Sequence, residues 1–199
     1  VPGSLRPGRL SCVQLTREAI VTAAVEILDA YGLADMTMRR VATSLGVAPG
    51  ALYWHIANKQ ELIAAIAEEI LTPVLADAAP TTSMELAGVL RAAMLSRRDG
   101  AELVAAALSQ PASGTRAVVE KRLAQTLPGD EGLNRVGAAS LLHLVLGATS
   151  LDQAEKQHAA DTGGEVPRDV SADFTRGVAL LLTGLDAAAK SSDLNSEQL

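Results

Sequence analysis

Residues 38–57 read MRRVATSLGVAPGALYWHIA, and this stretch decides the fold. Thr37 is suited to cap one short helix, and Pro49 is suited to the first turn of a second. Two helices cross closely at a sharp turn when the contact residue is small and the turn residue accepts a left-handed backbone. Ala42 and Gly46 meet these two needs. The stretch therefore predicts a helix–turn–helix.

The remainder of the chain predicts helices throughout. Thr16 is placed to cap the first helix and Gly32 to end it. Ala, Leu and Glu dominate the later stretches, and alternating β-branched runs are absent, so the sequence predicts an all-α fold of about nine helices. We expect these helices at about 17–31, 38–45, 49–56, 59–77, 84–97, 100–109, 114–126, 132–156 and 171–189.

Composition excludes several classes of protein. The chain has 199 residues, of which 48% are hydrophobic, and this is ample for a packed core. One cysteine, Cys12, excludes a disulfide scaffold and a cysteine zinc cluster. The longest apolar stretch, residues 141–151, is shorter than the ~20 residues that span a bilayer. Residues 1–14 do not resemble a signal peptide, so we expect a soluble cytoplasmic protein without a membrane partner.

The formal charge of −6 is unevenly distributed. Residues 1–60 hold six basic and four acidic side chains, a net charge of +2, and the remaining 11 basic and 19 acidic groups give −8. Of the four aromatic residues, only Phe174 lies beyond residue 60. This division predicts an N-terminal unit that faces an anion, joined to an acidic and aliphatic unit.

The second helix of the motif is expected to present its aromatic end to an anionic partner. Such a helix enters the DNA major groove with its N-terminal residues on base edges, while neighbouring groups hold phosphates. Tyr53, Trp54 and His55 stand at its end, and Lys59 begins the next helix. The alternative is a plain helical hairpin in which Tyr53 and Trp54 form a buried pair.

These residues carry a family resemblance. The segment LTREAIVTAAVEILDAYGLADMTMRRVATSLGVAPGALYWHIANKQELI (15–63) resembles the DNA-binding domain of the TetR family of transcriptional repressors. MLSRRDGAEL (94–103), DQAEKQ (152–157) and FTRGVALLLTGLD (174–186) are similar to later family segments. The resemblance implies a homodimer whose N-terminal heads bind two operator half-sites. It also implies C-terminal helices that form a ligand pocket and the dimer interface.

The resemblance also implies roles for individual residues at the DNA. Thr37 and Lys59 would hold phosphates, and Arg39 would read a guanine, whose O6 and N7 atoms suit its forked guanidinium. At the start of the recognition helix this chain has Gly50 and Ala51, which offer apolar contact or close backbone approach. The predicted DNA-binding residues are Thr37, Arg39, Gly50, Ala51, Tyr53, Trp54, His55 and Lys59.

The expected ligand differs from that of the drug-binding members of the family. At positions where drug-binding family members ligate magnesium, this chain has Leu151 and either Val104 or Ala106, none of which ligates Mg²⁺. We therefore expect no metal or cofactor, and a small apolar effector other than a tetracycline–magnesium complex. His143 and Gln110 are candidate polar anchors, although a lone His in an apolar run is more often a core or interface residue. The predicted pocket consists of Leu75, Leu86, Leu90, Leu103, Gln110 and His143.

The last helix is expected to contribute to a dimer. Its small residues favour close packing, and its predicted interface residues are Phe174, Val178, Leu181 and Leu185. We expect a flexible arm at 1–14, a DNA-binding domain at 15–61, a ligand-binding and dimerisation domain at 62–190 and a flexible tail at 191–199. A helical dimer without DNA binding and an enzyme centred on His143 are the alternatives, but no nucleophile–base spacing supports catalysis.

Overall fold

The structure is a computed structural model that describes residues 15–76, 78, 80–111, 114–164 and 170–196. Within these residues it contains nine α-helices and no strand, which confirms the all-α prediction. Cys12 and the predicted arm 1–14 lie outside the described residues. The helices are α1 (Arg17–Tyr31), α2 (Met38–Ser44), α3 (Pro49–Leu52), α4 (Lys59–Leu75), α5 (Ser83–Leu95), α6 (Gly100–Leu108), α7 (Thr115–Ala124), α8 (Glu131–Thr162) and α9 (Val170–Ser196).

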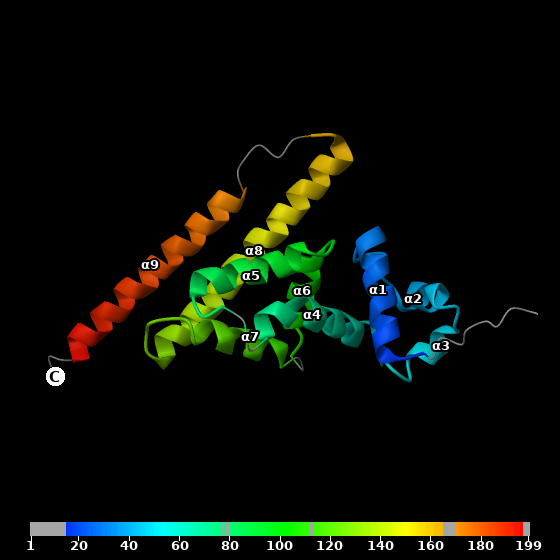
Figure 1. Cartoon of the computed structure of the whole chain (residues 1–199), viewed down its shortest axis with the longest axis horizontal. Coiled ribbons are helices and arrows are strands. Elements are labelled where there is room, and N and C mark those ends of the chain that lie inside the picture. Colours follow the sequence, from blue (N-terminus) through cyan, green and yellow to red (C-terminus); the bar gives the residue numbers. More distant parts are fainter. Residues whose placement is uncertain (1–14, 77, 79, 112–113, 165–169, 197–199) are drawn as a thin grey trace, which may run out of the picture.

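The first three helices form a head at one end of the molecule (Figure 1). The hydroxyl oxygen of Thr16 accepts a hydrogen bond from the Ala19 N–H at 3.2 Å, as an N-cap does. Gly32 ends α1 with φ +86°, and its N–H donates to the Leu28 carbonyl oxygen. Both predicted ends of this helix are confirmed.

Helix α4 joins the head to the body. It packs against α1 at one end and against α5 and α6 further along. Its apolar positions Leu62, Ile63, Ile66, Ile70 and Leu71 are all buried in one core that runs through the head and the body. In the body, α8 and α9 lie side by side as a long antiparallel pair (Figure 1).

Several helices end at residues other than those predicted. Helix α3 ends at Leu52, four residues before its predicted end, and after a turn Asn58 takes an extended backbone and caps α4. Helix α8 continues past 156 until Gly163 stops it with φ +69°. Helix α9 continues to Ser196, into the segment 191–199 expected as a flexible tail, and residues 197–199 are outside the described part. No helix in the described part of the chain is long and apolar enough to cross a membrane.

Candidate nucleic-acid interface

The turn between α2 and α3 has the predicted helix–turn–helix geometry. Gly46 has φ +67°, in the left-handed region that glycine enters without steric cost. The Val47 N–H donates to the Ala42 carbonyl oxygen at 3.0 Å and closes the turn. Val41 and Leu52 are fully buried, so the pair of short helices is fixed to the head's core on one side.

The other side of the motif is open. The Trp54 side chain is 89% exposed, and Tyr53 is also exposed. The alternative of a buried Tyr–Trp pair is therefore wrong. A large aromatic side chain in water leaves its apolar surface unburied, as is typical of a residue at a binding surface.

The other predicted contact residues are accessible as well. Thr37, Arg39, Gly50 and His55 are exposed, while Ala51 and Lys59 are part-buried. The Thr37 hydroxyl oxygen accepts from the Arg40 N–H at 3.2 Å, which makes it the N-cap of α2 in this structure.

Two neighbouring arginines differ in their contacts. Arg40 Nη1 donates to Asp35 Oδ1 at 2.7 Å, and its guanidinium carbon lies 3.8 Å from the centre of the Tyr31 ring. The Arg39 guanidinium is exposed and has no side-chain partner among the described residues. Arg39 therefore keeps its donors free for an external acceptor, whereas Arg40 is held within the head.

Helix α4 begins beside the motif with a well-formed cap. The Asn58 side-chain oxygen accepts from the Glu61 N–H at 2.9 Å, and Glu61 in return accepts from the Ala57 N–H at 2.7 Å. At the start of α1, a backbone hydrogen bond, a hydrogen bond with Thr16 and the nearby positive charge of Arg17 and His55 lower the pKa of Glu18. The contacts of Asn58 and Glu61 fix the start of α4, the helix that follows the recognition helix.

The head is held to the body by the turn Arg97–Gly100, which we call the RRDG turn. Asp29 in α1 accepts hydrogen bonds from Arg97 Nη1 at 2.9 Å and from the Arg98 N–H at 3.2 Å. Asp99, whose backbone is left-handed at φ +53°, accepts from the Leu33 N–H at 2.8 Å. The C-terminal end of α1 is therefore attached to the junction of α5 and α6.

One residue of α8 supports the RRDG turn from the body side. Gln153 Oε1 accepts from the Ala101 N–H at 2.9 Å, while Gln153 Nε2 donates to the Arg97 carbonyl oxygen at 2.9 Å and lies 3.4 Å from that of Met94. These backbone groups are at the end of α5 and the start of α6, where intrahelical partners are missing. Gln153 thus connects α8 to the turn that holds the head, a role that no local pattern predicted.

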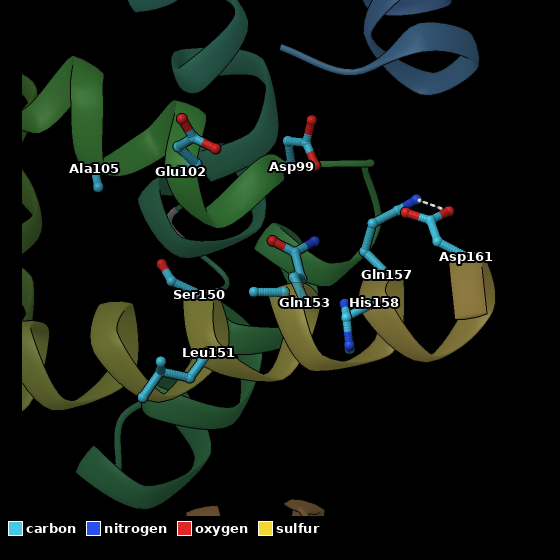
Figure 2. Close-up of a pocket in the computed structure, with 10 residues that line it drawn as sticks. Asp99, Glu102, Ala105, Ser150, Leu151, Gln153, Gln157, His158 and Asp161 are labelled. Carbon is cyan, nitrogen blue, oxygen red and sulfur yellow. Dashed lines mark hydrogen bonds between the residues drawn. The ribbon is translucent and has the colours of Figure 1, made fainter. Parts of the chain in front are cut away.

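The structure places the predicted pocket residues in different surroundings. Leu86, Leu90 and Leu103 are buried in the packed core, and Leu75 is partly buried against it. Gln110 Nε2 donates to the backbone and side-chain oxygens of Gln60 in α4, and His143 is exposed, with its Nε2 3.3 Å from Arg116 Nη2. Four cavities whose linings consist of described residues are formed by other side chains, and Figure 2 shows one of them, which lies between α6 and α8.

The predicted interface residues of α9 face the chain's own core. Val178 is fully buried, and Phe174, Leu181 and Leu185 pack against the core. The outward side of α9 instead carries Leu180, which is 75% exposed. Apolar spacing identified the amphipathic helix, but the most apolar side packs within one protomer.

A buried ion pair in the body joins helices that are far apart in the sequence. Arg91 of α5, which is 9% exposed, donates from Nη2 to Oδ2 of Asp152 in α8, which is 2% exposed. The guanidinium carbon of Arg91 also lies 4.9 Å from the centre of the Phe174 ring in α9. The pair thus joins three helices. The family-like segment DQAEKQ (152–157) contains Asp152, but nothing in that segment indicates that Asp152 pairs with Arg91.

Comparison with known proteins agrees with this architecture. The family model described as "Bacterial regulatory proteins, tetR family" matches residues 20–66. The tetracycline repressor protein class E of Escherichia coli is 31% identical over 155 residues, which cover 72% of each chain.

Solved structures extend the likeness to the whole body. The crystal structure of Mycobacterium smegmatis BioQ superposes with a TM-score of 0.77 at 39% identity and covers 87% of this chain and 99% of that chain. BioQ in complex with its double-stranded DNA operator has a TM-score of 0.73 at 36% identity, over 86% of this chain and 98% of that chain. The chain therefore belongs to the TetR family and is a helix–turn–helix, DNA-binding transcriptional regulator.

Proposed function

We propose that the chain is a repressor that binds a palindromic DNA operator as a homodimer and is released by a small molecule. The observation that carries the proposal is the free, exposed set of Arg39, Tyr53 and Trp54 on one helix–turn–helix. The likeness to BioQ, which was solved on its operator, supports DNA as the partner.

Each contact residue has a role that suits its chemistry. Arg39 reads a guanine through O6 and N7, a contact that contributes about 1–3 kcal/mol of discrimination. Thr37 and Lys59 hold phosphates, and Tyr53, Trp54 and His55 contact the backbone and bases. Gly50 and Ala51 at the start of α3 allow close approach of the helix to the groove and apolar contact with a thymine methyl group.

The dimer forms through the outward sides of α8 and α9. Leu180 on α9 and Val136 on α8 are exposed apolar residues, and Gly147 and Gly184 are exposed small residues on the same two helices. Small residues let two helices approach closely, and an apolar side chain without cover gains by burial against a second copy. In this arrangement residues 15–61 bind DNA, and residues 62–190 dimerise and bind the effector.

The effector of the body is a small apolar molecule other than a tetracycline–magnesium complex. The family resemblance places Leu86 and Leu90 at positions that contact the drug in members that bind it, and both leucines are buried in an aliphatic core. Leu151, where a metal-linked carboxylate would stand, is 62% exposed and offers no oxygen. An apolar effector would separate these packed side chains and would bind most tightly to the form with lower DNA affinity.

Selection from a random duplex library, followed by fluorescence anisotropy with the selected duplex, tests the proposal. The Lys59→Ala change should weaken binding to all sequences and lower the salt slope by about one. The Arg39→Ala change should relax specificity at one base pair, with a loss of about 1–3 kcal/mol on the selected sequence. Unchanged binding in both variants, or no duplex selected, would favour a helical dimer without DNA contact.

A further inference from the structure

The exposed side of α3 carries no hydrogen-bonding side chain. Ala48, which precedes the helix, is exposed, as are Pro49 and Gly50. Ala51 is part-buried, and Leu52 is fully buried in the core of the head. Helices α2 and α3 lie on the side of α1 that faces away from the body (Figure 1). The recognition helix therefore offers a partner an apolar surface at residues 48–51.

The fold itself does not require these residue types. Ala48 makes no side-chain cap hydrogen bond at the start of α3, whereas Thr37 caps α2 and Asn58 caps α4. Gly50 is not among the glycines with positive φ, and a Cβ there would meet no described atom outside its own helical turn within 4 Å. Alanine is a poor N-cap, and glycine is less stable than alanine within a helix. Neighbouring residues that break local rules in this way are typical of a functional surface.

The chemistry of the DNA major groove decides what this surface can read. The donors and acceptors on the base edges need polar side chains, which residues 48–51 do not have. The apolar group that the groove offers is the C5-methyl group of thymine, which packs against small apolar side chains such as alanine. Because Gly50 has no Cβ, the helix can approach this methyl group more closely.

We propose that α3 recognises the C5-methyl group of a pyrimidine, so that it accepts 5-methylcytosine in place of thymine. Both bases present this methyl group at the same place in the groove. They differ in the neighbouring group, which is the O4 acceptor in thymine and the N4 donor in cytosine. Only a hydrogen-bonding side chain could separate these two groups. The inference rests on the proposed function, and it names the chemical feature by which α3 selects the operator.

Anisotropy with modified forms of the selected duplex tests the proposal. Each thymine is first replaced singly by uracil, which removes the methyl group and keeps O4. At one or more thymines of each half-site, uracil should lower the affinity by about fourfold, as expected for one buried methyl group. At those positions a 5-methylcytosine–guanine pair should bind within about twofold of thymine–adenine. The unmethylated cytosine–guanine pair should bind at least about fourfold more weakly than the methylated pair.

Variants of the chain assign the methyl contact to α3. Gly50→Ala should keep or raise the free energy of unfolding, because alanine favours a helix, but its Cβ should lower DNA affinity by about fivefold or more. Gly88→Ala is the matched control, because Gly88 is a glycine within α5 of the body whose Cβ would also find open space. It should change DNA affinity by less than about twofold. Tyr53→Ala should keep the fourfold penalty for uracil, because the methyl group contacts α3 and not the Tyr53 ring.

Several results would overturn the proposal while leaving DNA binding intact. If 5-methylcytosine–guanine binds as weakly as cytosine–guanine, a hydrogen bond to O4 selects thymine. If uracil replaces thymine without loss at every position, no methyl group is read. An unchanged DNA affinity of Gly50→Ala, or loss of the uracil penalty in Tyr53→Ala, would show that α3 does not make the contact. If no duplex is selected at all, the proposed function fails together with this inference.

Discussion

Breaking the buried ion pair between Arg91 and Asp152 should cost more stability than any surface charge change. The Asp152→Ala change would leave the Arg91 side chain, which is 11% exposed, without its carboxylate. Arg91 Nε already lacks a hydrogen-bond partner, and the Phe174 ring, 4.9 Å from the guanidinium carbon, cannot replace a full negative charge. Removal of one partner from a buried pair costs about 3–5 kcal/mol. This is a large part of the ~5–15 kcal/mol that stabilises a typical domain.

Replacing both partners should cost far less than replacing one. The double change Arg91→Met with Asp152→Leu removes both charges and fills the space with apolar side chains. Because the cost of removing two charges from water then disappears, such replacements are often neutral or stabilising by about 1–4 kcal/mol. We expect the double variant to be at least about 2 kcal/mol more stable than Asp152→Ala.

Urea unfolding followed by circular dichroism at a fixed protein concentration measures these differences, because dimer stability depends on concentration. The control is Glu120→Ala, which breaks a partly exposed pair with Arg116 one helical turn away. It should cost about 0.3–0.5 kcal/mol. A loss below about 1 kcal/mol for Asp152→Ala, or a double variant as unstable as the single one, would refute the reasoning.

Three further changes test the head and its attachment. Arg40→Ala should lower the free energy of unfolding by about 0.5–2 kcal/mol, because it removes an ion pair and a ring contact. Arg39→Ala should change that free energy by less than about 0.5 kcal/mol. Equal losses of the two variants in urea unfolding would contradict this distinction. Gly32→Ala would place a Cβ 2.7 Å from Asp99 Oδ2 at φ +86°, so it should cost at least about 1 kcal/mol, and an unchanged midpoint of thermal unfolding would exclude the strain. Gln153→Ala should lower the free energy of unfolding by about 1–3 kcal/mol and speed amide hydrogen exchange in the RRDG turn. Unchanged exchange there would show that the turn is stable without Gln153.

Local signals predicted the head accurately. The caps at Thr16 and Thr37, the stop at Gly32 and the turn at Gly46 each depend on residues within about five positions of one another, so the sequence displays them directly. The exposed aromatic end of the recognition helix also followed from position, since Leu52 and Ile56 take the buried side.

Features of the body depend on contacts between distant residues. Arg91 and Asp152 are 61 positions apart, and no spacing rule joins them. The apolar side of α9 predicted an amphipathic helix, but the pattern could not say whether Val178 faces its own chain or a partner. Leu86, Leu90 and Leu103 are buried in the core, and residue type alone does not separate a filled core from a ligand pocket.

The exposed Trp54 allows DNA binding to be followed by the intrinsic fluorescence of the protein. It is the sole tryptophan of the chain, so all indole fluorescence comes from the tip of the recognition helix. Because that indole is already in water, unfolding leaves its emission nearly unchanged, while contact with DNA shifts or quenches it. Effector binding in the body leaves this emission unchanged unless it moves the head. Intrinsic fluorescence can therefore follow DNA contact without a label, while circular dichroism follows the helices.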